Sequence, residues 1–282
     1  MNGNYKMIIG MPVDIGNKLS INKVYANYLT SANFSVIGIY PQDNLYKITG
    51  LCDGLLLPGG VDIDPIFYGE DNERSLAVNP ERDKLERELL ALFVEADKPI
   101  LGICRGFQLI AREYLSSIPE KNTNLLFSQH VNNHSLVDEL SIKRHVLSHL
   151  VRGQKCLISG DINDIQQISF PVNSMHHQCL LMNTSYRITV QPALDKKGKW
   201  PTLKGINILA GTNRGISDKN RKDWIIVEAF SLHNLAGMLK ILCVQWHPEE
   251  INNYALLQLC FGRDNIGIVD DEVYKSLYRR EY

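Results

Sequence analysis

The stretch PILGICRGFQLIA, from Pro99 to Ala111, predicts a strand, a sharp turn and the start of a helix. Its apolar run of strand length ends at Ile103, and apolar residues at helical spacing follow Arg105. Strand, turn and helix in this order are the unit from which parallel α/β sheets are built. The turn presents Cys104 either as a nucleophile or as a small buried hydrophobe, and this stretch alone leaves both readings open.

Short apolar and β-branched runs alternate with helical patterns on both sides of this stretch. An amphipathic helix is predicted at 79–97, where Asn79 followed by Pro80 signals a helix start. The pattern predicts one α/β domain over 1–282, with a mostly parallel sheet, helices on both faces and extra antiparallel edge strands. The segments predicted as strands are 7–10, 35–40, 54–57, 99–103, 167–172, 186–191, 224–230 and 239–244.

Two segments depart from this alternation. The stretch 194–223 is rich in Gly, Lys, Asn and Asp and has little periodicity, so we expect a surface insertion. The stretch 263–282 is expected to form a C-terminal helical tail, in which Tyr274, Tyr278 and Tyr282 share one face. That face suits docking on the body of the chain, which we prefer, or on a second subunit in a homodimer.

Composition narrows the class of protein. The 282 residues are 44% hydrophobic and 22% charged, and the formal net charge is -1, so no basic field attracts nucleic acid. No apolar run has the length of a membrane span, and no membrane partner is expected. The six cysteines form no CxxC pair, which favours reduced thiols and a cytoplasmic protein.

A second motif near the other end of the chain bears on Cys104. The apolar run 239–244 is followed by Gln245, Trp246 and the tripeptide His247-Pro248-Glu249. Residues two apart in an extended chain face the same side, so His247 and Glu249 can meet. A capping turn with a solvated glutamate is the alternative for the tripeptide alone. Together with the cysteine turn, the motif favours a base and its orienting acid.

These residues resemble the class I glutamine amidotransferase-like hydrolases, and within them the gamma-glutamyl-gamma-aminobutyrate hydrolase group of gamma-glutamyl peptidases. Four motifs carry the resemblance and stand in the order found in that family. They are LPGGVDIDPIFYGE from Leu57, PILGICRGFQ from Pro99, VNSMHHQ from Val172 and VQWHPE from Val244.

The resemblance implies a flavodoxin-like fold and a hydrolase that needs no metal or organic cofactor. It implies cleavage of a small γ-glutamyl amide through a glutamyl thioester, releasing glutamate and an amine. It also implies a Cys-His-Glu triad, an oxyanion hole of backbone N–H groups, and a substrate pocket. The residues concerned are Cys104, His247 and Glu249 for the triad, Gly60 and Arg105 for the oxyanion hole, and Gln108, Ser174, His176, His177 and Gln178 for the pocket.

Two departures from the family concern the substrate. Relatives have a small glycine-rich loop after the nucleophile helix, whereas this chain has EYLSSIP at 113–119, and the region 194–223 is short in relatives. Both indicate an unusual substrate, larger than γ-glutamyl-aminobutyrate. The alternatives to a stand-alone hydrolase are a glutaminase subunit that supplies ammonia to a partner synthase, and a catalytically silent binding module.

The remaining motifs are interpreted as structural. His130 with His134, and His145 with His149, have the spacing of zinc ligands on a helix, but no glutamate follows the first histidine of either pair as in zinc proteases. The glycine-containing stretch 211–215 lacks the Lys-Ser/Thr of a phosphate-binding loop and predicts a surface turn. No metal site is expected.

Overall fold

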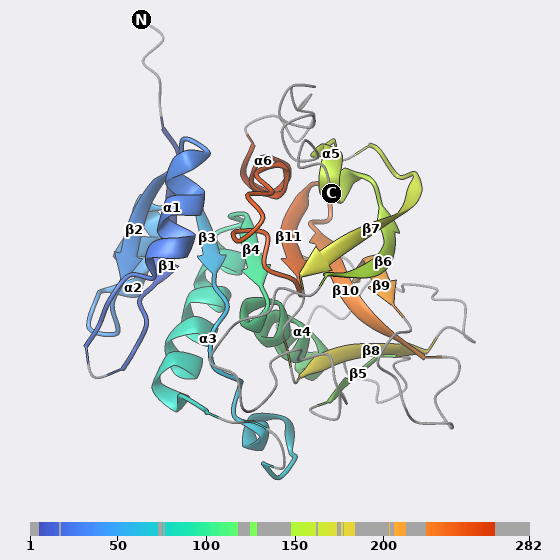
Figure 1. Ribbon diagram of the computed structural model, residues 1–282. Helices are drawn as coiled ribbons and strands as arrows, with labels where there is room; N and C mark the ends of the chain where they lie inside the picture. Colours follow the sequence, from blue (N-terminus) through green and yellow to red (C-terminus); the bar gives the residue numbers. More distant parts are fainter. Residues whose placement is uncertain are drawn as a thin grey trace, which may run out of the picture.

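The structure is a computed structural model (Figure 1), and it describes residues 6–16, 18–72, 75, 77–117, 125–128, 148–161, 163–173, 176, 178–183, 203, 206–212 and 224–262. The helices are α1 (Lys23–Ser31), α2 (Leu45–Leu51), η1 (a 3-10 helix, Pro65–Tyr68), α3 (Pro80–Glu95), α4 (Arg105–Ser117), α5 (Cys156–Ser159) and α6 (Ala255–Phe261). The strands are β1 (Ile8–Pro12), β2 (Ser35–Ile39), β3 (Gly54–Leu57), β4 (Ile100–Ile103), β5 (Leu125–Ser128), β6 (Ser148–Gln154), β7 (Gln167–Asn173), β8 (Cys179–Asn183), β9 (Asn207–Thr212), β10 (Trp224–His233) and β11 (Leu239–Val244).

One sheet runs through the molecule in the order β2-β1-β3-β4-β11-β10-β9-β6-β7, with β8 beside β10 and β5 beside β8. Five neighbouring strands, β2, β1, β3, β4 and β11, are parallel, and their arrowheads point the same way in Figure 1. The α/β class and the flavodoxin-like order are confirmed. The sheet is mixed, however, because β5 to β10 all pair antiparallel, which is more than the edge strands that we predicted.

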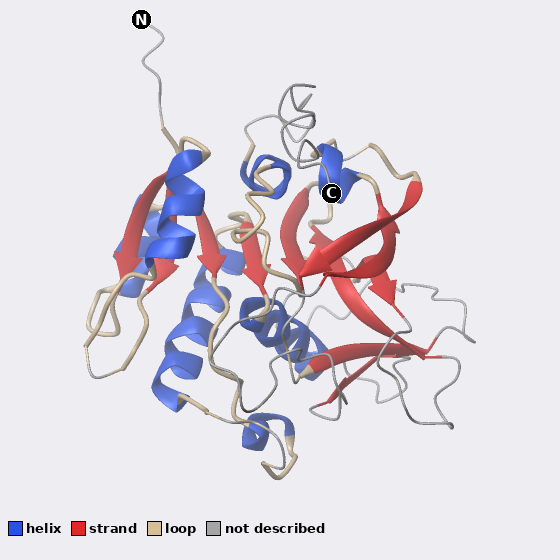
Figure 2. Ribbon diagram, in the orientation of Figure 1, coloured by secondary structure: helices blue, strands red, loops and turns tan. Residues whose placement is uncertain are grey.

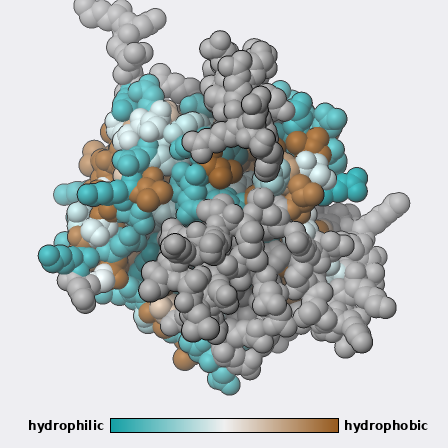
Figure 3. Space-filling model, viewed as in Figure 1, coloured by the Kyte–Doolittle hydropathy of each residue, from teal (hydrophilic) through white to brown (hydrophobic). Residues whose placement is uncertain are grey.

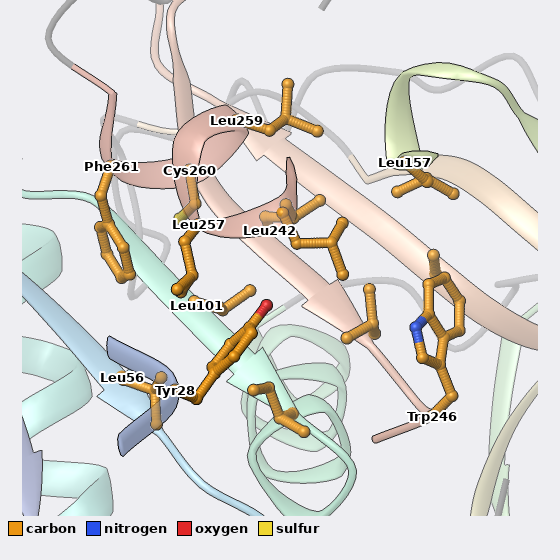
Figure 4. Close-up of a cluster of buried hydrophobic side chains, with 14 of the residues drawn as sticks. Tyr28, Leu56, Leu101, Leu157, Leu242, Trp246, Leu257, Leu259, Cys260 and Phe261 are labelled. Atoms are coloured by element: carbon orange, nitrogen blue, oxygen red, sulfur yellow. The ribbon is translucent and has the colours of Figure 1, made fainter. Parts of the chain in front are cut away.

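Helices cover both faces of the parallel strands (Figure 2), as predicted. Side chains of β11 alternate between two cores: Leu242 and Val244 face one, and Ile241 and Cys243 face the other. The first core, drawn in part in Figure 4, is closed by residues of α1, α5 and α6. The second is closed by residues of α3 and α4. Both faces of the central strands are therefore buried, which explains their continuous apolar sequence.

The predicted elements of the parallel half are confirmed within one or two residues. The helix predicted at 79–97 is α3, and the Asn79 side chain accepts a hydrogen bond from the Arg82 N–H as its N-cap. The strand predicted at 186–191 and the helical tail at 263–282 lie outside the described residues, and so does the proposed tyrosine face. Among the described helices, none is long and apolar enough to cross a membrane.

The expected surface insertion at 194–223 is wrong in one part. Asn207–Thr212 form β9, which pairs with β10 and β6, while Leu203 and Ile206 are buried. Apolar residues at 206, 208, 209 and 210 give this stretch a buried face despite its Gly- and Asn-rich surroundings. The turn predicted at 211–215 is wrong at its start, because Gly211 and Thr212 belong to β9; residues 213–215 lie outside the described residues.

The described part of the segment 113–119, which departs from the resembled family, continues the helix that follows Cys104, because α4 extends to Ser117. Buried Glu113 lies 2.8 Å from Arg87 Nε and 2.6 Å from an Arg112 nitrogen. The Tyr114 hydroxyl accepts a hydrogen bond from the Ile206 N–H at 3.0 Å. Residues 113–117 therefore anchor α4 to α3 and to the chain leading into β9.

The histidines proposed and rejected as zinc ligands fall largely outside the described residues, which exclude 130, 134 and 145. His149 lies in strand β6, so a helical pair of 145 and 149 is not formed.

The hydropathy of the surface is mixed: on the described part of the face in Figure 3, hydrophobic patches alternate with hydrophilic ones.

Candidate functional site

Cys104 occupies the turn between β4 and α4, at the carboxyl end of the parallel strands. Its backbone has φ of 50°, in the left-handed region that a residue with a side chain rarely adopts. The Cys104 N–H donates to the Val244 carbonyl of β11 at 2.9 Å, which holds the turn against the neighbouring strand. A sharp strand-to-helix turn of this kind projects a nucleophile from the sheet edge. The residue is 6% exposed.

Gly106, two residues after Cys104, must be a glycine because the backbone of β3 lies too close for a side chain. A Cβ on Gly106 would lie 2.1 Å from the carbonyl oxygen of Leu57 in β3. The first turn of α4 therefore packs directly on β3. This position brings the N–H of Arg105, the first residue of α4, beside Cys104; N–H groups in the first turn of a helix have no carbonyl one turn earlier to bond.

The structure brings His247 and Glu249 to Cys104 from the end of β11. His247 Nδ1 lies 2.7 Å from Glu249 Oε1, and both side chains are nearly buried. Asn173 of β7 fixes the backbone here: its carbonyl accepts from the His247 N–H at 3.2 Å, and its Nδ2 donates to the His247 carbonyl at 3.0 Å. The predicted meeting of His247 and Glu249 is therefore present.

The charge state of His247 depends on Cys104. Burial lowers the pKa of His247, but the negative charge of Cys104, a hydrogen bond between the two side chains, and Glu249 together raise it to about 11. Stability from this raised pKa is fully present below about pH 6.5 and is lost as the pH rises towards 11. The surroundings of His247 therefore favour the imidazolium form of its ring.

Replacing Cys104 with alanine should lower the pKa of His247, because the largest of the influences that raise it is removed. The titration of the His247 ring, followed by NMR in wild type and Cys104→Ala, measures this change. A Cys156→Ala variant, which removes a buried thiol in α5, should leave the titration where it is. An unchanged His247 pKa in Cys104→Ala would contradict the coupling.

The loop after β3 lies against His247 and Cys104 through Gly59, and against Arg82 through Gly60. A Cβ on Gly59 would lie 3.0 Å from His247 Cε1 and 3.4 Å from Cys104 Cβ. Gly60 has φ of 155°, and a Cβ there would lie 2.2 Å from the Arg82 guanidinium. That guanidinium also donates a hydrogen bond to the Gly59 carbonyl at 2.9 Å, which holds the loop in place. Close approach at both positions requires glycine.

Tyr25 of α1 is a member of the site that sequence reasoning missed. Its hydroxyl accepts from the Gly59 N–H at 3.0 Å, lies 3.4 Å from His247 Nδ1, and hydrogen-bonds to Glu249. Burial, and then the negative charges of Glu249 and Cys104, raise the pKa of Tyr25 well above its ordinary value. The phenol is therefore neutral. Nothing in the sequence separates it from Tyr28, which lies one turn along the same helix.

A buried ion network underlies the nucleophile turn and the glycine loop. Arg82 Nε lies 2.7 Å from Glu86 Oε1, and Arg105 bonds to both Glu86 and Asp83. All four side chains are at most 5% exposed. Glu86 therefore joins the arginine that holds the glycine loop to the arginine that follows Cys104. The family resemblance implies a role for Arg105 only through its backbone N–H, and nothing in the sequence predicts this role of its side chain.

The described residues that are expected around the glutamyl pocket, Gln108 and Gln178, are more fully buried than Cys104, His247 and Glu249. Gln108 Nε2 donates to the Gln178 carbonyl at 2.9 Å. The Gln178 side chain is fully buried and bonds to both the N–H and the carbonyl of Ile63, at 3.2 and 2.7 Å. It thereby fastens the segment that follows the glycine loop. Substrate contact by Gln108 and Gln178 stays a prediction.

Of the serine and the two histidines in the motif VNSMHHQ, the structure describes only His176. His176 is buried; its Nδ1 lies 2.9 Å from the Gln178 carbonyl, and its Nε2 lies 3.9 Å from Glu228 Oε1. Ser174 and His177 lie outside the described residues. Their proposed substrate contacts stay predictions.

One group of side chains in the described part of the chain has the spacing of a metal site. His247, Glu249 and Glu250 offer ligand atoms within 4.8 Å of one another. These atoms already engage protein partners: His247 Nδ1 contacts Glu249, and Glu250 Oε2 accepts from Asn173 Nδ2 at 3.2 Å. The group orients the imidazole of His247.

Comparisons with known proteins find relatives in sequence and a similar fold. The chain is 29% identical to a glutamine amidotransferase-like protein of Rickettsia prowazekii over 78% of this chain and 79% of that one. It is 28% identical to the gamma-glutamyl-gamma-aminobutyrate hydrolase PuuD of Escherichia coli K12, over 74% and 69% of the two chains. The glutaminase domain of CTPS from Trypanosoma brucei, solved with bound acivicin, has a similar fold, with a TM-score of 0.54, 14% identity, and coverage of 94% and 97%.

The family model described as Peptidase C26 matches residues 4–198, which contain the glycine loop, the Cys104 turn and the 172–178 motif. The match covers more than half of the chain, and relatives of the glutamine amidotransferase-like kind match beyond it. A hydrolase or amidotransferase type of activity on amide bonds is supported by the same matches. The chain belongs to the Peptidase C26 family.

Proposed function

We propose that this protein is a cysteine hydrolase that cleaves γ-glutamyl amides, with Cys104 as nucleophile, His247 as acid and base, and Glu249 as the orienting acid. The observation that carries the proposal is the hydrogen-bonded series Cys104, His247, Glu249 in and beside a strained strand-to-helix turn. Nucleophile, base and orienting group in hydrogen-bond reach are the arrangement that covalent catalysis requires.

The first half of the reaction forms a thioester. Cys104 Sγ attacks the γ-carbonyl carbon, and the N–H groups of Gly60 and Arg105 hold the tetrahedral oxyanion. The C–N bond then breaks, and His247 gives its proton to the leaving amine. In the second half, His247 takes a proton from water, the hydroxide attacks the thioester, and glutamate leaves with regeneration of Cys104. The similarity to a gamma-glutamyl-gamma-aminobutyrate hydrolase supports the glutamyl specificity.

Acyl-enzyme trapping tests the proposal directly. The protein is incubated with a γ-glutamyl amide and quenched in acid, and the Cys104 peptide is examined by mass spectrometry while released glutamate is measured. A glutamyl group on Cys104 and stoichiometric glutamate and amine are expected. Glutamine hydrolysis that requires a synthase partner would instead support the amidotransferase-subunit reading, and no adduct with any substrate or glutamine-like electrophile would favour the silent binding module.

Tyr25→Phe should lower kcat/KM for glutamate release by about tenfold, because the hydroxyl that joins the Gly59 N–H to Glu249 is lost. The unpartnered, buried Gly59 N–H should also lower the free energy of unfolding by about 1–3 kcal/mol. Tyr28→Phe is the matched control. Tyr28 lies on the same helix as Tyr25, and the change removes a buried hydroxyl that donates to the Asn253 carbonyl. Equal activity losses in the two variants would show that Tyr25 acts through stability alone.

A further inference from the structure

A cavity of about 300 Å³ opens beside the glycine loop, at the carboxyl ends of β1 and β3. The chain leaves β1 towards β2 on one side and later returns to form β3 on the other, so these two strand ends border the point where the strand order reverses. Ligands of open α/β sheets bind in the crevice at such a point. The cavity lies on the same sheet edge as Cys104, and Gly59 borders both.

The distance to Cys104 fits the part of a substrate that lies beyond the scissile bond. Strand β1 stands two places from β4 in the sheet, and neighbouring strands are about 4.8 Å apart. The ends of β1 and β4, beside the cavity and Cys104, are therefore about 10 Å apart along the sheet edge. A leaving amine with several methylene groups covers that distance.

Most polar groups that line the cavity are engaged by the protein itself. The side-chain oxygens of Asn22 and Asn79 cap α1 and α3, and Asn79 Nδ2 donates to the Ile15 carbonyl at 2.6 Å. The Arg82 guanidinium bonds to Glu86 and to the carbonyls of Pro58 and Gly59. These groups shape the cavity and have little capacity left for a ligand.

Asp14 is the exception. One of its oxygens lies 3.3 Å from an Arg82 nitrogen, yet its side chain is 37% exposed, whereas that of Arg82 is 5% exposed. A carboxylate has about four acceptor positions, so this single contact leaves capacity for a donor in the cavity. The apolar part of the lining comes from Ile15, Val61 and Val78. The lining therefore offers an aliphatic wall and one accessible negative charge.

We propose that this cavity is the leaving-group subsite, and that Asp14 selects amines that carry a second, positively charged group on an aliphatic stem. The inference rests on the proposed γ-glutamyl hydrolysis and names its substrate class. An amine that ends in a carboxylate would place like charges together at Asp14 and lose affinity.

Three γ-glutamyl amides of matched length test the selection, those of pentylamine, 1,5-diaminopentane and 5-aminopentanoic acid. The diamine amide should have a kcat/KM about fivefold above that of the pentylamine amide, and the carboxylate-bearing amide should be slowest. Asp14→Asn should reduce the diamine preference to near one. Glu81→Gln, which removes an exposed carboxylate from the first turn of α3 outside the cavity lining, should preserve it.

Binding to a protein that cannot react separates the subsite from the chemistry. Calorimetry of 1,5-diaminopentane and pentylamine with Cys104→Ala should show tighter binding of the diamine, and adding Asp14→Asn should abolish the difference. Glutamate release without any charge preference, or the fastest release from the carboxylate-bearing amide, would overturn the subsite and leave the proposed function standing. Diamine binding that depends on Asp14, without glutamate release from any amide, would overturn the proposed function and the leaving-group role of the cavity, and would leave Asp14 as a cation-binding residue.

Discussion

Replacing Cys104 with alanine should lower glutamate release from a γ-glutamyl amide on the order of 10⁴-fold or more, with the fold intact. Removal of the thiol eliminates the attacking atom, and the proposed oxyanion donors of Gly60 and Arg105 have no thioester path to assist. Alanine tolerates φ of 50° about as poorly as cysteine does, so the strain in the turn changes little. The measurement is kcat/KM from released glutamate, together with the thermal unfolding temperature.

A matched control keeps this result interpretable. Cys156→Ala also removes a buried thiol, but from α5 on the far part of the sheet, and it should retain activity within about twofold if the protein stays folded. Full activity of Cys104→Ala would exclude Cys104 as the nucleophile. Equal losses in both variants would point to stability.

Replacing Glu86 with glutamine should lower the free energy of unfolding by about 3 kcal/mol, because its carboxylate is shared by two buried arginines. The isosteric amide retains the shape of the side chain but removes that shared charge, so Arg82 keeps only Asp14 and Arg105 only Asp83 as a carboxylate partner. For a protein of this size we expect the melting temperature to fall by roughly 10 °C. Urea unfolding measures the change in free energy directly.

The exposed Glu88 on the same helix supplies the comparison. Glu88→Gln should change the free energy of unfolding by about 0.5 kcal/mol or less, since exposed charges contribute little. A Glu86→Gln protein as stable as Glu88→Gln would show that the buried network adds nothing to stability. Reactivity of Cys104 towards a thiol reagent, measured in both variants, then shows whether the network also positions the nucleophile turn.

The parallel half of the fold was predictable because its strands and helix starts are marked by short stretches of neighbouring residues. Strands buried on both faces are continuous apolar runs, and Asn79-Pro80 marks the start of α3. The antiparallel half was less predictable, because the glycine and asparagine residues of β9 and its flanks resemble a loop. Its position is decided by pairing with β10 and β6, which no local pattern contains.

The candidate site divides in the same way. Cys104, His247 and Glu249 carry residue types and spacings with a recognisable chemical purpose, and the structure brings them together. Tyr25 was missed because a tyrosine on an amphipathic helix predicts core packing, and only the fold places its hydroxyl beside Gly59. For Gln178, the fold shows bonds to Ile63 that its motif did not predict, while its substrate contact stays a prediction.

The hydrogen bond from the Cys104 N–H to the Val244 carbonyl has a consequence for protein synthesis. The ribosome releases β4 long before β11, so a nascent chain holds the thiol but has neither the strand that fixes its turn nor His247. The described strands made between them are β5 to β10, and β10 pairs with β11 on the side away from β4. The turn of Cys104 therefore gains its bond to Val244, and its neighbours His247 and Glu249, only when β11 pairs with β4. If Cys104 is the nucleophile that we propose, an incomplete chain lacks its base and its orienting acid.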